Sequence, residues 1–276
     1  MLIGSHATVT GGLATGGLAY AEAVGAEVIQ VFVSNPRGWA VSTRDPEQDT
    51  RLRESGMPVF VHAPYLINLG AADEATVSKS AQAVAHALRR GRQIGARGVV
   101  VHTGSATGQD RDRALRQLAG LLLPVLATLT HDDPDLLLEP MAGQGQMLCG
   151  RAAELGPYLE ALERHPKAGV CLDTCHLFAA GHDLTKPDGV AQTMAEVERA
   201  AGPGRVKLVH ANDSQLGLGS RRDRHETIGK GEIGVEPFRE LLSHPVLAGV
   251  PFVVETPGGK SGHARDIALL KELRDA

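Results

Sequence analysis

The sequence predicts an α/β fold made of one closed barrel of eight strand–helix units. Short apolar runs alternate with helical segments rich in Ala, Leu, Glu and Arg, and this alternation is typical of a parallel sheet with helical crossovers. The length of 276 residues is a common size for one (β/α)8 barrel. No linker, charge run or low-complexity segment divides the chain, so we expect residues 1–276 to form a single domain.

Eight segments have the length and apolar content of buried parallel strands, which are covered on both faces. In chain order the expected strands are residues 2–6, 27–33, 58–63, 97–103, 135–140, 168–174, 205–211 and 249–256. The clearest helical patterns between them are residues 73–94, 111–129 and 194–201.

Composition narrows the class of protein. Hydrophobic residues make up 42% and charged residues 22%, which suits a large core and excludes a disordered chain. No apolar run reaches the roughly 18 residues of a membrane span. No signal-like start and no Cys-x-x-Cys pair are present, so we expect reduced thiols and a cytoplasmic protein. The glycine pairs near the N-terminus lack a Walker or dinucleotide fingerprint, which argues against a nucleotide cofactor.

Six consecutive predicted strands end in an imidazole or a carboxylate. These residues are His62, His102, Glu139, Asp173, His210 and Glu255. Each shares side-chain parity with the residue two positions earlier, as Phe60 does with His62, so all six are expected to point into the barrel near one rim. One such residue would be explained as a hydrogen-bonded core group, whereas six favour a shared site at the carboxyl ends of the strands.

Three further residues of the same types lie close to these strand ends: His176, Asp223 and His225. Buried carboxylates and imidazoles without matching Lys or Arg residues need a compensating cation. Nitrogen and oxygen ligands favour Zn²⁺, with Mn or Fe as alternatives. Nine ligands suffice for three sites with three protein ligands each, so the sequence predicts a multinuclear centre.

Five motifs, in order along the whole chain, resemble the endonuclease IV family of apurinic/apyrimidinic endonucleases. They are residues 61–69 (VHAPYLINL), 142–145 (AGQG, after Glu139), 171–181 (CLDTCHLFAAG), 210–214 (HANDS) and 223–225 (DRH). The resemblance implies a TIM barrel with three zinc ions. It assigns His62, His102 and Glu139 to one ion, Glu139, Asp173, His210 and Glu255 to a second, and His176, Asp223 and His225 to the third.

The resemblance also implies an activity, which is DNA repair by cleavage of duplex DNA on the 5′ side of an abasic site. This cleavage leaves a 3′-hydroxyl, and removal of 3′ blocking groups is an implied second activity. Two ions that share Glu139 would lower the pKa of a water and hold the phosphodiester oxygens, while Glu139 orients the water. We therefore expect Glu139 to be the catalytic carboxylate of a monomeric enzyme.

Contact with DNA is expected on the rim of the barrel, because an abasic nucleotide must leave the helix to reach buried metals. Tyr65 and Leu66 follow His62 by three and four residues, and Arg37 lies on the preceding strand-end loop. We expect these three side chains to enter the base stack. The alternative is that residues 65–67 only pack their loop onto the barrel.

The chain departs from the family pattern at two places. Pro140 and Met141 follow Glu139 where the family has Asn-Thr, and Ser34 stands where a Lys is expected before Asn35. Proline lacks an N–H donor, so the hydrogen bonds around Glu139 are expected to differ. The net charge of −4 is also unusual for a DNA-binding protein, although three divalent ions would make it positive.

Two rival functions remain open at this point. Metal-dependent sugar isomerases and epimerases use similar barrels, but they need one or two metals, so the set of His176, Asp223 and His225 argues against them. A non-catalytic DNA-damage binder with structural zinc is the second rival, and such zinc sites are usually rich in cysteine.

Several other residues have simpler expected roles. His6 is expected to form a hydrogen bond beside the metal ligands, and Cys171 to pack inside the barrel. Five histidines on helical or loop segments are expected at the solvated surface: His86, His131, His165, His244 and His263.

Overall fold

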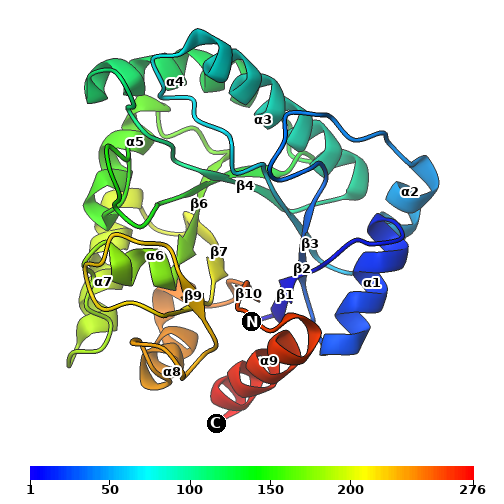
Figure 1. Cartoon of the computed structure of the whole chain (residues 1–276), viewed down its shortest axis with the longest axis vertical. Coiled ribbons are helices and arrows are strands. Elements are labelled where there is room, and N and C mark those ends of the chain that lie inside the picture. Colours follow the sequence, from blue (N-terminus) through cyan, green and yellow to red (C-terminus); the bar gives the residue numbers. More distant parts are fainter.

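The computed structural model describes all residues from 1 to 276 and shows a closed eight-stranded parallel barrel surrounded by helices (Figure 1). Around the barrel the strands follow the order β1, β2, β3, β4, β5, β6, β7 and β10, with β10 paired to β1. Their bounds are Ile3–His6, Ile29–Phe32, Val59–His62, Gly98–His102, Asp135–Glu139, Ala168–Asp173, Val206–His210 and Phe252–Val254. The predicted fold class is confirmed.

The helices pack outside the barrel. They are α1 (Leu13–Val24), α2 (Pro46–Glu54), α3 (Glu74–Ile94), α4 (Arg111–Leu126), α5 (Leu155–Ala161), α6 (Thr174–Ala179), α7 (Gly189–Ala201), α8 (Glu236–Ser243) and α9 (Gly259–Asp275), with short 3₁₀ turns at Ala152–Glu154 and Pro245–Leu247. Helix α3 begins after Asp73, whose carboxylate accepts a hydrogen bond from the N–H of Thr76. It ends at Gly95, whose positive φ of 71° closes the last turn.

Two hydrophobic cores result from the alternation of side chains along the strands. The larger core lies between the barrel and the helices. The smaller one joins one buried residue from each of seven strands or their starts, and only the inside of the barrel brings these together: Val28, Phe60, Val100, Leu137, Cys171, Leu208 and Val253. This apolar layer forms the floor on which the next inward-facing layer rests, and it confirms the expected packing of Cys171.

The predicted element ends differ from the observed ones by small amounts with local causes. Strand β10 begins at Phe252 instead of residue 249, because Pro251 cannot donate to the sheet. Helix α7 begins at Gly189, five residues before the expected start. A two-stranded antiparallel pair, β8 (Asp213–Ser214) with β9 (His225–Glu226), was not expected. It folds the loop after β7 back over the barrel mouth.

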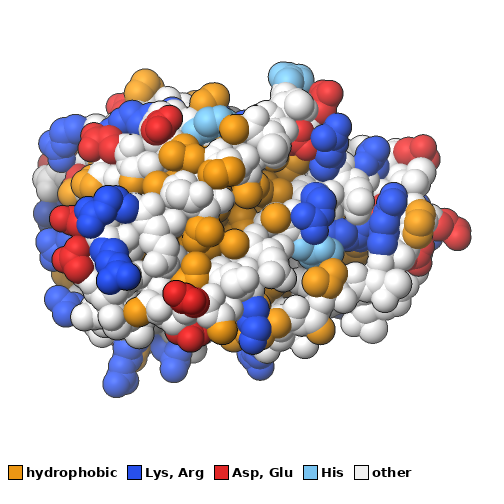
Figure 2. Space-filling view, turned by 90° about the horizontal axis from the view of Figure 1, so that it is seen from above, with side chains coloured by type: hydrophobic (Ala, Val, Ile, Leu, Met, Phe, Trp, Pro, Cys, Tyr) orange, Lys and Arg blue, Asp and Glu red, His pale blue; other side chains and the backbone are white.

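The outer surface carries charges of both signs. Figure 2 shows the side of the molecule formed by α3 and α4, where a strip of hydrophobic side chains crosses between groups of Lys, Arg, Asp and Glu. Ala81 of α3 and Leu121 and Val125 of α4 are partly buried hydrophobic residues packed against the larger core. No helix in the chain is both long enough and apolar enough to span a lipid bilayer.

A candidate metal centre at the barrel mouth

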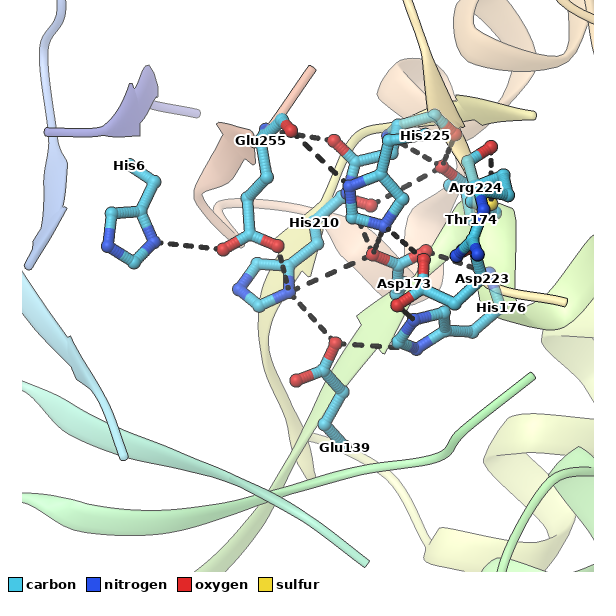
Figure 3. A network of polar contacts seen from close by, with 12 residues as sticks. His6, Glu139, Asp173, Thr174, His176, His210, Asp223, Arg224, His225 and Glu255 are labelled. Carbon is cyan, nitrogen blue, oxygen red and sulfur yellow. Dashed lines mark hydrogen bonds and ion pairs between the residues drawn. The ribbon is translucent and has the colours of Figure 1, made fainter. Parts of the chain in front are cut away.

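The nine predicted ligands lie together at the carboxyl ends of the strands. Figure 3 labels all of them except His62 and His102. They form three groups in which the potential ligand atoms lie within 4.8 Å of one another: His62, His102 and Glu139; Asp173, His210 and Glu255; and His176, Asp223 and His225. A further group at the same spacing, Glu139, Asp173 and His176, connects the three. The geometry therefore brings together every residue of the predicted centre.

The centre opens into a cleft of about 490 Å³ lined by seven of the nine residues together with Tyr65, Met141 and Arg224. Asp173 and His210 lie below the cleft and are fully buried. Asp223 is the most open of the nine, with 41% of its side chain exposed. The potential metal ligands at the floor of the centre are thus shielded from water, while the side of the centre at Asp223 remains open to a substrate.

Glu139 occupies the middle of the cluster. Its Oε1 lies 3.1 Å from Nδ1 of His210 and 3.5 Å from Nδ1 of His176. Its Oε2 lies 3.3 Å from Nε2 of His62 and 3.4 Å from Nε2 of His102. Burial raises the pKa of this carboxyl group, but the neighbouring imidazoles, first His210 and then His102, hold it well below its usual range. The two oxygens face different groups of donors, as a bridging ligand requires.

Backbone carbonyl groups orient three of the imidazoles. In each case Nδ1 lies near a carbonyl oxygen: His62 with Ala63 at 2.6 Å, His176 with Pro140 at 3.0 Å, and His225 with Glu255 at 3.3 Å. A carbonyl oxygen only accepts, so Nδ1 carries a proton, and Nε2 is the ring nitrogen that can bind a cation. Nε2 of these rings faces the acidic cluster. The carbonyl of Pro140 thus has a role although this residue departs from the family pattern.

Three buried atoms in the cluster make no hydrogen bond of good geometry, namely Glu139 Oε2, His176 Nε2 and His225 Nε2. Their near neighbours are atoms of other candidate ligands, such as the oxygens of Asp223, which lie 3.2 Å from Nε2 of His176 and 2.9 Å from Nε2 of His225. Buried polar atoms are normally paired, so these atoms point to a missing cation or water. The cluster also contains several carboxylates that raise the pKa of the neighbouring imidazoles. Burial lowers the pKa of His176 and His225, but the surrounding carboxylates, first Asp173, raise these values to about 10 and about 9. Divalent cations fit this combination of charge and donors.

Two buried amides in the site were not singled out from the sequence. Gln30 contacts His210 and Glu255, at 2.9 and 2.7 Å. Asn212 donates to Oδ2 of Asp173 at 2.7 Å and accepts from the N–H of Glu255 at 2.8 Å. The alternation of side chains along the strand could have identified Gln30 as inward-facing, because it follows the inward-facing Val28 by two residues. A polar residue at that place in a buried strand needs partners inside the barrel.

Cys175 also lies within ligand distance of Asp173 and His225. Burial raises the pKa of its thiol to about 12, and its Sγ lies 3.6 Å from the carbonyl oxygen of Arg224. The thiol thus has a hydrogen-bond acceptor of its own in the backbone of Arg224.

The residues expected to contact DNA lie on the same rim. Tyr65 and Leu66 are 45% and 38% exposed, and Arg37 is exposed on the loop after β2. Ile67 is buried and anchors the loop to the barrel, which leaves the two preceding side chains free to project. The ring of Tyr65 stacks beside His102 with 5.7 Å between centroids.

His6 forms the expected hydrogen bond beside the ligands, with Nδ1 2.9 Å from Oε1 of Glu255. Of the five histidines expected at the surface, His131 is exposed, three are partly buried (His86, His165 and His244), and the expectation is wrong for His263. His263 is only 7% exposed, because its ring joins α9 to the rest of the fold. Its Nδ1 lies 3.0 Å from the hydroxyl of Tyr20, and its Nε2 lies 2.9 Å from the carbonyl oxygen of Thr256.

Known proteins resemble this chain over its full length. The sequence profile of the xylose isomerase-like TIM barrel family matches residues 18–273. A relative from Streptomyces avermitilis, described as a probable endonuclease 4, is 58% identical over 279 residues, which cover 99% of this chain and 90% of that protein. A protein with the same description from Chloroflexus aurantiacus is 40% identical and covers 98% of this chain and 97% of its own length.

Comparison with solved structures leads to the same family as the sequence relatives. Endonuclease IV from Thermus thermophilus superposes with a TM-score of 0.87 at 33% identity, over 100% of this chain and 99% of that chain. A D-tagatose 3-epimerase-like protein has a TM-score of 0.73 over 100% of this chain and 97% of its own, but its 17% identity shows the fold alone. With the sequence match, the barrel and the arrangement of the donors in agreement, the chain belongs to the endonuclease IV family.

Proposed function

We propose that this protein is a zinc-dependent repair endonuclease that hydrolyses the phosphodiester on the 5′ side of an abasic site in duplex DNA and leaves a 3′-hydroxyl. Removal of 3′ blocking groups is the second activity of the same centre. The proposed cofactor is three Zn²⁺ ions, and Mn or Fe suits the same nitrogen and oxygen donors. All nine donors come from one chain, so a monomer is sufficient.

One observation carries this proposal: three groups of three donors share one open cleft in a chain 58% identical to a protein described as a probable endonuclease 4. The potential ligands are imidazoles and carboxylates at an open cleft, where a substrate can approach. Structural zinc sites, by contrast, are closed and rich in cysteine. The buried atoms of Glu139, His176 and His225 that make no hydrogen bond of good geometry give such ions a place in this chain.

Bound zinc ions would activate a water molecule at neutral pH and neutralise charge on the phosphate oxygens. The protein supplies the arrangement. Glu139 presents one oxygen to each of two donor groups, and Asp173 is held against the second group by Asn212. His176, Asp223 and His225 form the group nearest the cleft opening, where Asp223 is the most exposed donor. No nucleophilic Ser or Cys is needed.

The rim residues have a separate part in the proposal. Tyr65 and Leu66 stand beside the cleft and would fill the space left in the duplex when the abasic nucleotide swings toward the metals. Arg37 would enter from the loop after β2. Bound cations would also add positive charge at the mouth and so offset the net charge of −4 of the whole chain.

The test uses the purified protein without added Mg²⁺ and a labelled duplex with one abasic site. We expect one cut on its 5′ side, an end that a polymerase extends, no cut in the intact duplex, and close to three transition-metal ions per chain. Chelation should abolish cleavage, and zinc should restore it. One ion or fewer in active protein would disprove the trinuclear centre. Metal-loaded protein that leaves the abasic duplex intact would disprove the activity.

A further inference from the structure

Gln30 occupies a special place in the barrel. In β3, β4, β5, β6, β7 and β10, or directly after the strand, the inward-facing residue two positions beyond the apolar floor is one of the candidate ligands. In β2 this position follows Val28 and holds Gln30, which is fully buried. A neutral amide is a poor zinc ligand compared with a carboxylate or an imidazole. Its burial at this level of the barrel therefore calls for another role.

The contacts of Gln30 define the orientation of its amide. Its Nε2 lies 2.7 Å from Oε1 of Glu255, and its Oε1 lies 2.9 Å from Nε2 of His210. A carboxylate only accepts hydrogen bonds, so the NH₂ group of the amide must face Glu255. The carbonyl oxygen of the amide then faces His210 and accepts from its Nε2–H. His6 lies beside both groups, with Nδ1 2.9 Å from the same oxygen of Glu255 and 3.0 Å from Nε2 of Gln30.

This contact gives His210 the opposite orientation to the other oriented imidazoles. His62, His176 and His225 turn Nδ1 toward backbone carbonyls and Nε2 toward the cluster. In His210, Nε2 faces the amide oxygen of Gln30, and Nδ1 faces the carboxylates, 3.1 Å from Glu139 and 3.4 Å from Glu255. No backbone carbonyl performs this function for His210. The side chain of Gln30 takes its place.

We propose that Gln30 is a positioning residue that holds His210 in the Nε2–H tautomer, so that Nδ1 is its metal donor, and steadies Glu255 beside the same ion. The inference rests on the proposed metal centre. Without the amide, the His210 ring is free to carry its proton on Nδ1, and Glu255 loses a donor. A carboxylate at position 30 would still accept from His210 but would stand against Glu255 with like charge.

The first test needs no substitution. In zinc-loaded protein with ¹⁵N-labelled histidine, NMR distinguishes the protonated ring nitrogen from the metal-bound one. We expect metal binding through Nδ1 for His210 and through Nε2 for His62, His176 and His225. Coordination of His210 through Nε2 would overturn the inference, whatever the substituted proteins do.

The second test measures zinc affinity by competition with a chromophoric chelator. Gln30→Met keeps the length of the side chain and removes both hydrogen bonds, so we expect one of three ions to bind about 10- to 100-fold more weakly. The His210 signal should become a mixture of tautomers. Gln30→Glu should keep the Nδ1 signature, because its carboxylate still accepts from Nε2–H. Val28→Ala, one layer below in the same strand, is the matched control for loss of buried packing and should bind zinc like the parent.

The outcomes separate the two proposals. Parent affinity for all ions and an unchanged His210 signal in Gln30→Met would overturn the role of Gln30 and leave the metal centre intact. A parent protein that binds no zinc would overturn the metal centre and this inference with it. If Gln30→Met does not fold, the signals of the parent and of Gln30→Glu still decide, because loss of the Nδ1 signature in Gln30→Glu contradicts the proposed hydrogen bond.

Discussion

Replacing Glu139 by glutamine is the most direct test of how the centre is organised. The substitution keeps the shape of the side chain, removes its charge and turns one oxygen into an NH₂ group that cannot bind a cation. Both oxygens of Glu139 are engaged, one near His210 and His176 and the other near His62 and His102, at 3.1 to 3.5 Å. Either orientation of the new amide therefore disrupts one group of donors.

The size of the expected loss of turnover follows from the burial of the Glu139 carboxylate. The carboxylate is 1% exposed, and removing one partner from a buried charged network costs about 3–5 kcal/mol. If this loss falls on the transition state, where each 1.36 kcal/mol is tenfold in rate, turnover drops by about 10²- to 10⁴-fold. The fold itself should persist, since the apolar floor below Glu139 is unchanged.

The assay is single-turnover cleavage of an abasic duplex, with circular dichroism and metal analysis on the same samples. Glu27→Gln is a suitable control, because this residue lies before β2 at the opposite end of the barrel, where it pairs with Arg274 at 2.8 Å and Lys271 at 3.3 Å. Its loss should lower stability and leave cleavage unchanged. A Glu139→Gln protein that cleaves within a few-fold of the parent rate would remove Glu139 from the centre of the mechanism.

Three further predictions concern the rim, the loop and the acid stability. Three substitutions on the rim are Tyr65→Ala, Leu66→Ala and Arg37→Ala. Each should weaken binding to an abasic duplex by about 1–3 kcal/mol at unchanged metal content, as measured by anisotropy at fixed salt. Affinities equal to that of the parent would refute the insertion of these side chains. Asp213→Ala should lower the free energy of unfolding in urea by about 2–3 kcal/mol, because five backbone N–H groups donate to this buried carboxylate. A smaller loss than that of an exposed Asp→Ala control would contradict the estimate. Burial raises the pKa of Asp49, but the paired Arg90 and Arg44 hold it below its ordinary value, so the parent should be more stable than Asp49→Asn above about pH 4 and should lose this advantage as the pH falls further. Thermal unfolding of both proteins at several pH values measures this difference, and a constant difference at all pH values would exclude the ion pair as its source.

The fold and the composition of the centre could be predicted because both depend on short-range patterns. Parity along a strand decides whether a side chain faces into the barrel, so Leu208 on the floor placed His210 one layer above it. Closure of the barrel then brought strand ends separated by up to 193 residues, from His62 to Glu255, into one cluster. Neither step requires knowledge of loop conformation.

Other features depend on loops and on contacts between distant residues, which such patterns do not encode. The strand was expected to continue to Thr174, but a helix begins there, because the carboxylate of Asp173 caps it by accepting from the N–H of His176 at 2.8 Å. The pair of β8 and β9 was missed because each strand has only two residues, too few for a periodic signal. His263 was wrongly placed at the surface since its partners, Tyr20 and Thr256, come from other elements.

The position of the centre follows from the requirements of its donors. A metal-binding imidazole commonly donates its other ring N–H to an acceptor, and four of the five candidate ligand histidines have such an acceptor behind them. At strand ends the chain turns out of the sheet and its carbonyls become free, as those of Ala63, Pro140 and Glu255 are for His62, His176 and His225. The ring of His210 has no such carbonyl, and the buried side-chain amide of Gln30 serves instead.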